Sequence, residues 1–251
     1  MLNFAANLSF LFGELPFSQR FAAAAKAGFK AVEFLFPYDF EPREISTLIE
    51  DAKLTLALFN MPPGNWGKGE RGLAAVPGQE MRFKTTVETA LPYLLETGLK
   101  QIHVMAGCVE PNERDSAKDV YMENLSQAAK RLNEEGINLL IEPINTTDMP
   151  GYFLNNVETA VDIIRTVGAP NLKLQFDCYH RAMMGDDVIL GLKDNFSNIA
   201  HIQIAGMPDR HEPDDYSEVF ATLQELGYGG WIGCEYKPRT KTIDGLGWRP
   251  I

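Results

Sequence analysis

The chain has 251 residues, of which 45% are hydrophobic, and acidic residues outnumber basic ones 34 to 23. The resulting net charge of -11 would repel a phosphate backbone, which excludes nucleic acid as an expected partner. A chain of this length commonly forms one α/β barrel, so we expect a single domain over residues 1–251.

Cysteine usage and hydropathy point to a soluble protein of the reducing cytoplasm. The three cysteines, Cys108, Cys178 and Cys234, are widely spaced and form no C-x-x-C pair, so neither a disulfide framework nor a structural zinc site is indicated. No basic lead with a long apolar stretch opens the chain, and no run approaches the ~18 apolar residues that cross a membrane. We therefore expect no membrane partner and a cytoplasmic location.

Short strand-like runs alternate with longer amphipathic segments along the chain. The runs number eight and lie near residues 2–6, 30–36, 54–60, 100–106, 138–143, 172–177, 199–204 and 230–236. Apolar residues at helical spacing fall between them, over 17–27, 81–97, 121–135, 157–167 and 216–226. Each of these segments is followed by a glycine, the residue that favours a left-handed helix end: Gly28, Gly98, Gly136, Gly168 and Gly227. The alternation predicts parallel β-α units and a (β/α)8 TIM barrel.

An open doubly wound sheet is the alternative that this alternation allows. No G-x-G-x-x-G motif opens the first helical segment, so a dinucleotide-binding fold loses its main support. Only 15 residues follow Tyr236, and they include Pro238 and Pro250. We therefore expect a short, irregular tail in place of a full eighth helix.

Four successive strand-like runs end in an oxygen-bearing side chain, namely Glu142, Asp177, Gln203 and Glu235. Such groups are costly at the ends of buried strands unless they are paired or bind a metal. The carboxyl ends of barrel strands surround the active site, so these side chains are expected to converge. Three carboxylates and one amide suit Mg²⁺ or Mn²⁺ better than zinc. The alternative is that each one caps a helix or pairs with a surface lysine.

Short motifs along almost the whole chain add a second line of evidence. They are NLS at 7–9, VEFLFPY at 32–38, GERG at 69–72, IEPIN at 141–145, FDCYH at 176–180, HIQIA at 201–205 and GCEY at 233–236. Together they resemble the hydroxypyruvate isomerase family, a group of xylose isomerase-like TIM barrels. Segments 205–214 and 234–239 resemble its 2-oxo-tetronate isomerase branch, whereas 65–66, 142–145 and 177–180 resemble the hydroxypyruvate branch.

The resemblance implies an intramolecular oxidoreductase, an isomerase of the aldose-ketose type. Glu142 and Glu235 would be the catalytic acid/base pair, and Glu142, Asp177, Gln203 and Glu235 would be the metal ligands. The reaction moves a carbonyl along a small hydroxy-oxo acid through an enediol, whose charge a divalent cation would stabilise. The leading reaction is hydroxypyruvate to 2-hydroxy-3-oxopropanoate (tartronate semialdehyde), and the runner-up is 2-oxo-tetronate to 3-oxo-tetronate.

Three further residues are candidates for substrate binding. The family pattern has a substrate-facing histidine at His180, where the alternative is an exposed loop histidine. The guanidinium of Arg210 has the shape to clamp a carboxylate or hydroxyls, where the alternative is a solvated arginine. Arg71 lies on a glycine-rich loop that would close over the ligand, where the alternative is simple turn formation. His103 and Gln175, like His201, are interpreted as hydrogen-bonded core polar groups.

One departure from the family pattern concerns the loop after the seventh run. Relatives carry additional residues where Asp214 here runs directly into Asp215 and Tyr216, so the loop that bears Arg210 is short. This shortening bears on how Arg210 is held and on substrate preference, and it leaves the four predicted metal ligands untouched.

More distant functions remain as alternatives, namely a ketose 3-epimerase, a metal-dependent phosphodiesterase and an inactive binding barrel. A phosphodiesterase would need a histidine-rich multi-metal site and a basic surface, whereas this chain has 4 histidines and a net charge of -11. Retention of both glutamates argues against an inactive barrel. The exposed helices of a barrel make a homodimer a reasonable expectation.

Overall fold

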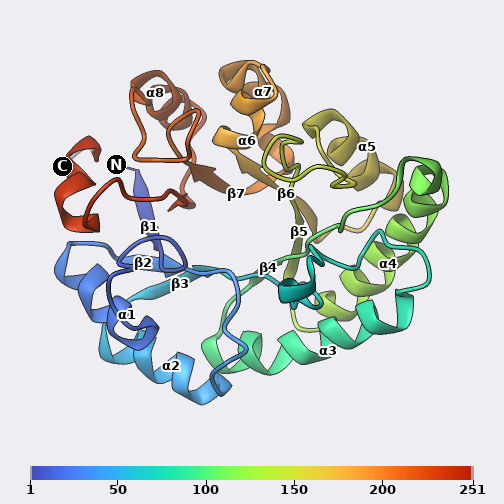
Figure 1. The fold of residues 1–251 in the computed structure, drawn as a ribbon, viewed down its shortest axis with the longest axis horizontal. Coiled ribbons are helices and arrows are strands. Elements are labelled where there is room, and N and C mark those ends of the chain that lie inside the picture. The colour runs from blue at the N-terminus through green and yellow to red at the C-terminus, as the bar shows by residue number, and fades with distance from the viewer. Residues whose placement is uncertain (1, 250–251) are drawn as a thin grey trace.

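The computed structural model describes residues 2–249 and consists of eight parallel strands surrounded by helices (Figure 1). The strands are β1 (Asn3–Asn7), β2 (Ala31–Glu33), β3 (Thr55–Leu58), β4 (Gln101–His103), β5 (Asn138–Ile141), β6 (Leu172–Asp177), β7 (Ile199–Ile204) and β8 (Trp231–Cys234). Each expected run overlaps one of these strands. The predicted (β/α)8 barrel is therefore confirmed.

The sheet closes into a barrel between β3 and β4. Its ladder order is β3-β2-β1-β8-β7-β6-β5-β4, which leaves those two strands at the ends. The His103 amide donates to the Phe59 carbonyl at 3.1 Å, and the Met61 amide donates to the His103 carbonyl at 2.8 Å. These two hydrogen bonds join the ends, so the open-sheet alternative does not apply.

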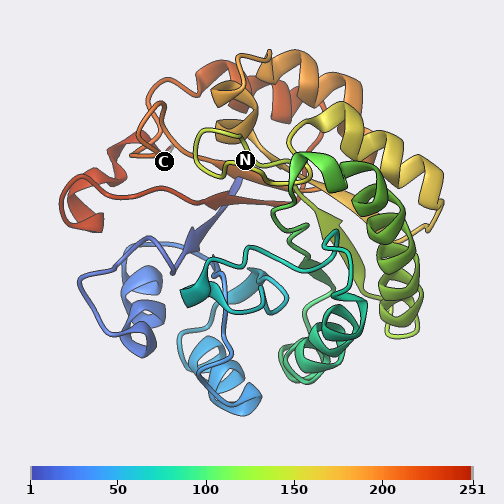
Figure 2. The same cartoon turned by 45° about the vertical axis from the view of Figure 1, so that its right-hand side comes forward.

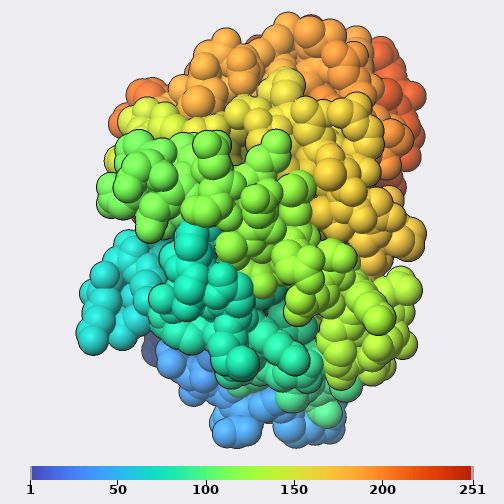
Figure 3. Space-filling view, turned by 90° about the vertical axis from the view of Figure 1, so that its right-hand side faces the viewer, coloured from blue at the N-terminus to red at the C-terminus, as the bar shows by residue number. Residues whose placement is uncertain are grey.

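Helices form an outer ring around the strands (Figures 1 and 2). They are α1 (Phe17–Lys26), α2 (Pro42–Asp51), α3 (Glu80–Thr97), α4 (Arg114–Asn133), α5 (Val157–Val167), α6 (Cys178–Met183), α7 (Val188–Asn195) and α8 (Ser217–Glu225). Figure 3 shows the continuous outer wall that α3, α4 and α5 build. The five expected helical segments are present, while α2, α6 and α7 fall outside them. Within residues 2–249, no helix combines the length and apolar character that a membrane crossing requires.

The chain finishes in a short turn, as expected. The 3-10 helix η4 (Thr242–Trp248) places the Trp248 ring 5.5 Å from that of Phe4 on β1. The Thr242 hydroxyl also accepts a hydrogen bond from the Phe12 amide. The last turn is therefore packed against the first strand.

Side chains alternate on the strands between the apolar layer under the helices and the barrel interior, and toward the carboxyl ends the interior positions are mostly polar. On β6, Leu174 and Phe176 join the apolar layer under the helices, while Gln175 and Asp177 alternate with them. The β6–β7 register places Gln175 beside His201 and Asp177 beside Gln203. Because the side-chain period of a strand is two, this alternation brings the polar groups into the barrel interior. Deeper in the interior, the Trp231 ring packs against a layer of three alanines, Ala5, Ala31 and Ala57.

Gly233 on β8 leaves room for a buried carboxylate. A Cβ at this position would overlap both carboxylate oxygens of Glu33. We expect Gly233→Ala to lower the free energy of unfolding by about 1–3 kcal/mol, measured by urea denaturation. Gly229→Ala is the matched control, because a Cβ there meets nothing within 4 Å, and its effect should stay within about 0.5 kcal/mol. Equal stability of the two variants would contradict this account.

Candidate active site

The structure gathers the four predicted metal ligands at the carboxyl end of the barrel. Asp177 ends β6, Gln203 lies on β7, and Glu142 and Glu235 directly follow β5 and β8. All four are at least 94% buried, with exposed fractions of 5% for Glu142, 4% for Asp177, 2% for Gln203 and 6% for Glu235. Glu142, Gln203 and Glu235 line a cavity of about 140 Å³.

Arg210 is the cation that faces these acids. Its Nη2 donates to Glu235 Oε2 at 2.6 Å and to Asp177 Oδ2 at 3.1 Å, and its Nε donates to the Glu235 carbonyl at 3.0 Å. The short loop after β7 holds it in place, because the Lys237 amide donates to the Arg210 carbonyl at 2.6 Å and the Gly206 amide to that of His211 at 2.8 Å. The loop after β7 therefore holds Arg210 in place and directs it into the site.

Burial raises the pKa of all three carboxyls above their ordinary values. For Glu235 burial is the largest cause and brings the pKa to about 8, although the Arg210 charge lowers it. Burial also raises the pKa of Glu142 well above its usual range, and repulsion from Glu235 and Asp177 adds to this. The pKa of Asp177 is raised by burial and lowered by Arg210. One guanidinium thus does not compensate three buried carboxylates, and the site has an affinity for further positive charge.

The donor set fits a hard divalent cation. Glu142, Asp177 and His180 each offer one ligand atom within 4.8 Å of the others, and Glu142 Oε1 has no hydrogen-bond partner among the described residues. Carboxylate oxygens are the ligands that Mg²⁺ and Mn²⁺ prefer. The amide oxygen of Gln203 accepts from Gln175 Nε2 at 2.7 Å, so it would exchange this partner to become a ligand.

A fourth buried acid, Glu33, supports Gln203 from below and was missed in the sequence analysis. Its Oε1 accepts from Asn7 Nδ2 at 2.9 Å and from Gln203 Nε2 at 2.8 Å, and its Oε2 lies 2.7 Å from His201 Nε2. Because the Gln203 NH2 group is directed at Glu33, its oxygen is directed away from that carboxylate. Glu33 and Asn7 end β2 and β1, and a polar side chain at a strand end is the same signal that led to the four predicted metal ligands.

His103 differs from its expected role as a hydrogen-bonded core residue. It is buried and lines the cavity, yet neither ring nitrogen has a hydrogen-bond partner among the described residues. Its Nε2 lies 3.6 Å from Glu142 Oε2, and burial lowers its pKa to about 3, so the imidazole is neutral. The side-chain oxygen of Gln175, Oε1, likewise has no hydrogen-bond partner within residues 2–249. The expectation holds better for His201, whose Nε2 pairs with Glu33.

The predicted substrate-binding residues occupy different places. His180 is buried within the site, with Nε2 at 3.6 Å from Asp177 Oδ2 and 3.9 Å from Glu142 Oε1, so it is not an exposed loop histidine. Arg71 instead stacks on Trp66, with its guanidinium carbon 3.8 Å from the ring centroid. Trp66 packs against Phe36 and both line the cavity. Arg71 thus supports the cavity wall, and its contact with substrate stays a prediction.

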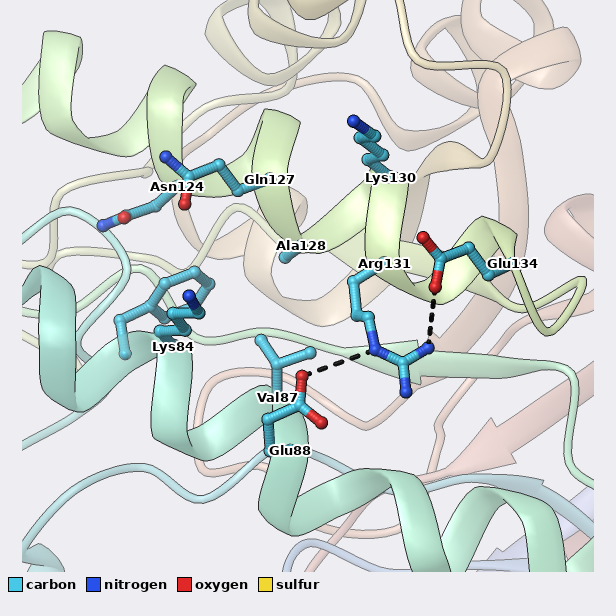
Figure 4. A pocket seen from close by; sticks show the side chains of 10 residues that line it. Lys84, Val87, Glu88, Asn124, Gln127, Ala128, Lys130, Arg131 and Glu134 are labelled. Carbon is cyan, nitrogen blue, oxygen red and sulfur yellow. Dashed lines mark hydrogen bonds and ion pairs between the residues drawn. The ribbon is translucent and has the colours of Figure 1, made fainter.

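A second cavity, of about 230 Å³, lies on the outer surface between α3 and α4 (Figure 4). Arg131 within it pairs with Glu88 at 3.4 Å and with Glu134 at 3.2 Å, so its charges neutralise one another. No buried polar side-chain atom of the residues lining it lacks a hydrogen-bond partner. This outer cavity is the larger of the two. The buried acids Glu142 and Glu235, however, line the cavity at the barrel mouth, which is therefore the candidate active site.

Fold and site together define a (β/α)8-barrel enzyme with a cluster of buried carboxyls at the carboxyl ends of its strands. The family model described as xylose isomerase-like TIM barrel matches residues 21–249, and the chain belongs to this family.

Relatives cover nearly the whole chain. It is 51% identical to a 2-oxo-tetronate isomerase of Cupriavidus necator, over 99% of this chain and 97% of that protein. It is 42% identical to a hydroxypyruvate isomerase of Escherichia coli, over 99% of this chain and 98% of that protein. A crystal structure described as an AP endonuclease, family 2, from Brucella melitensis superposes with a TM-score of 0.97 at 45% identity, covering 99% of this chain and 98% of that one.

The raised carboxyl pKa values predict how stability depends on pH in metal-free protein. A pKa that rises from 4.5 to about 8 on folding means that the folded state favours protonated Glu235. This contribution is complete below pH 4.5 and is lost as the pH rises through about 8. Urea unfolding in the presence of a chelator should therefore show a decreasing free energy of unfolding across this range. The slope should be shallower in Glu235→Gln, and a free energy that rises with pH in this window would contradict the assignment.

Proposed function

We propose that this chain is a metal-dependent isomerase that moves a carbonyl along a small hydroxy-oxo acid through an enediol. The observation that carries the proposal is the pair Glu142 and Glu235. Both are buried, both line one cavity, and they follow strands that lie three positions apart around the barrel. Two carboxyls on separate sides of a small cavity suit a reaction in which a proton leaves one carbon and returns to its neighbour.

Proton transfer is favoured by the electrostatics of this pair. A general acid or base works best when its pKa lies near the working pH, and burial brings the pKa of Glu235 to about 8. Glu142 is also shifted upward and interacts with Glu235, so the loss of a proton from one favours retention of a proton on the other. The pair can therefore hold one proton and release it within the site.

Glu142, Asp177, Gln203 and Glu235 would hold the Mg²⁺ or Mn²⁺ ion, which when bound supplies a Lewis acid that stabilises the negative charge of the enediol. His180 and Arg210 line the same cavity and would orient the substrate oxygens. On another wall, the Phe36 and Trp66 rings pack at an interplanar angle of 59° and would exclude water from the reacting carbons.

The cavity favours a small substrate. Its volume of about 140 Å³ is below the ~300–1,000 Å³ of pockets for drug-sized ligands. The 51% identity to a 2-oxo-tetronate isomerase, against 42% to a hydroxypyruvate isomerase, supports 2-oxo-tetronate to 3-oxo-tetronate as the leading reaction and hydroxypyruvate to 2-hydroxy-3-oxopropanoate as the second. This order is the reverse of the one expected from the sequence, whose motifs are divided between the two branches.

Phosphodiester hydrolysis is the less favoured function, despite the description of the Brucella melitensis structure. A net charge of -11 opposes binding to a nucleic acid backbone, and His103 and His180 are the histidines that line the cavity.

The cytoplasmic location is part of the proposal, in agreement with three free cysteines in the described residues. The homodimer stays a prediction.

Proton NMR in D₂O tests the proposal directly. With the Mg²⁺- or Mn²⁺-loaded protein, we expect isomerisation and deuterium incorporation with 2-oxo-tetronate, hydroxypyruvate or both. Glu142→Gln and Glu235→Gln should each lower the rate by roughly 10²–10⁴-fold, because each removes one acid/base group. Glu88→Gln, on the outer surface, is the control and should leave the rate unchanged. The proposal would be overturned if neither substrate showed exchange. Full activity in both glutamate variants would also overturn it.

A further inference from the structure

The side-chain amide of Asn145 has a fixed orientation beside His180. Its Oδ1 accepts hydrogen bonds from the backbone amides of Thr147 at 3.0 Å and Asp148 at 2.8 Å. Its Nδ2 donates to Asp148 Oδ2 at 3.1 Å. Backbone amides are donors only and an ionised carboxylate is an acceptor only, so the three contacts agree on which end of the amide carries hydrogen.

This orientation determines the state of the His180 imidazole. Asn145 Nδ2 lies 2.7 Å from His180 Nδ1, and both groups are buried. An NH2 group can only donate, so Nδ1 must be the acceptor and carries no hydrogen. A neutral imidazole has one donor and one acceptor, which leaves the hydrogen on Nε2. A doubly protonated ring is excluded by the same contact.

We propose that Asn145 is a positioning residue that holds His180 in the tautomer with its proton on Nε2, which makes His180 a hydrogen-bond donor and not a metal ligand. His180 Nε2 lies near Asp177 and Glu142, at 3.6 and 3.9 Å, and distance alone would admit it to a metal site with them. A protonated ring nitrogen has no free electron pair for a cation. The ligand set is therefore the oxygen set, without His180.

The neighbouring contact of Arg210 follows from the same assignment. Arg210 Nη1 lies 3.1 Å from His180 Nε2, and a guanidinium can only donate. His180 cannot accept at both nitrogens, so one of its two contacts is not a hydrogen bond. Asn145 is anchored by the backbone of its own turn, whereas Arg210 is a long side chain with Asp177 and Glu235 as other partners. The contact between Arg210 and His180 is therefore the one that is not a hydrogen bond. The N–H groups of Arg210 Nη1 and His180 Nε2 then both point at the same place in the cavity.

Two converging donors make a site for an acceptor oxygen. Resting on the proposed function, we assign this place to an oxygen of the hydroxy-oxo acid. Asp148 strengthens the arrangement, because it also accepts from the Tyr179 hydroxyl at 2.9 Å and so holds the turn against α6. A chain of hydrogen bonds thus runs from Tyr179 through Asp148 and Asn145 to His180. It orients the His180 imidazole toward the substrate.

Histidine tautomers are observed directly by long-range ¹H–¹⁵N correlation NMR of ¹⁵N-histidine-labelled protein. The chain has 4 histidines, and His180→Gln identifies the signal by its loss. We expect the Nε2–H tautomer for His180 both without metal and with saturating Mg²⁺. A proton on Nδ1, or a doubly protonated ring, in either state would overturn the proposal. No substrate is involved, so failure of the isomerase assignment would leave this result intact.

The double variant Asn145→Asp/Asp148→Asn tests whether Asn145 sets the tautomer. The introduced carboxylate still accepts from the two backbone amides, the introduced amide donates to it, and the Tyr179 hydroxyl keeps the Pro208 carbonyl as acceptor. The carboxylate would then accept from His180 Nδ1, which moves the proton to that nitrogen. Asp148→Asn alone is the control and should retain Nε2–H, because the backbone amides still orient Asn145. An unchanged tautomer in the double variant overturns the role of Asn145. A double variant that fails to fold leaves the parent spectrum as the deciding test.

The same variants give a second readout in turnover, with each substrate tested separately. Reversal of the tautomer removes one hydrogen-bond donor from the reacting oxygen, and we expect kcat to fall by roughly 10²–10³-fold in the double variant. The Mg²⁺ affinity of the double variant should change less than its kcat, because the oxygen ligands are untouched. A double variant with reversed tautomer and full activity would overturn the donor role.

Discussion

The burial of several carboxylates around a single guanidinium is the constraint on which the rest of the structure depends. Moving one ion out of water costs several kcal/mol even after relaxation, while a whole domain is stable by only about 5–15 kcal/mol. Glu142, Asp177 and Glu235 are nevertheless buried together, and Arg210 forms ion pairs with Asp177 and Glu235. Such a cluster is tolerated in a site that binds a cation. The positive charge of the cation offsets the repulsion among the carboxylates.

The barrel supplies the rigidity that this cluster requires. Strand alternation places an apolar layer under the helices and leaves the interior for polar groups, so each acid is attached to backbone that the outer core stabilises. Hydrogen bonds from Asn7 and Gln203 hold the Glu33 carboxyl at the inner side, and the loop after β7 holds Arg210 at the outer side. Positions of charged groups are thus determined by the scaffold and change little with solvent.

The fold and most of the site could be predicted because both follow from local patterns. Period-two alternation indicated the strands, and oxygen-bearing side chains at the strand ends indicated Asp177, Gln203 and both glutamates. Neither signal needs long-range information. Glu33 was missed because the apolar run continues from Val32 to Phe36, which places this residue in the middle of an expected strand, whereas β2 ends at Glu33. Helices α6 and α7 are 6 and 8 residues long, too short for a clear helical period.

Contacts between distant residues lay outside what the sequence pattern reveals. Both His103, which lacks a hydrogen-bond partner in the part of the chain that the structure describes, and the pairing of Asn145 with His180 across 35 residues depend on side-chain directions that no periodicity encodes. Arg71 shows the converse, since its glycine-rich surroundings indicate a flexible loop, whereas its guanidinium is stacked on Trp66.

We infer that the acidic cluster binds one divalent cation, and an equilibrium titration with Mn²⁺ followed by EPR measures this binding. We expect one saturable Mn²⁺ site per chain. Its affinity should rise with pH, because the metal displaces protons from the buried carboxyls. Binding should be weaker in Asp177→Asn. No saturable binding, or binding that is independent of pH and unchanged in that variant, would contradict this inference.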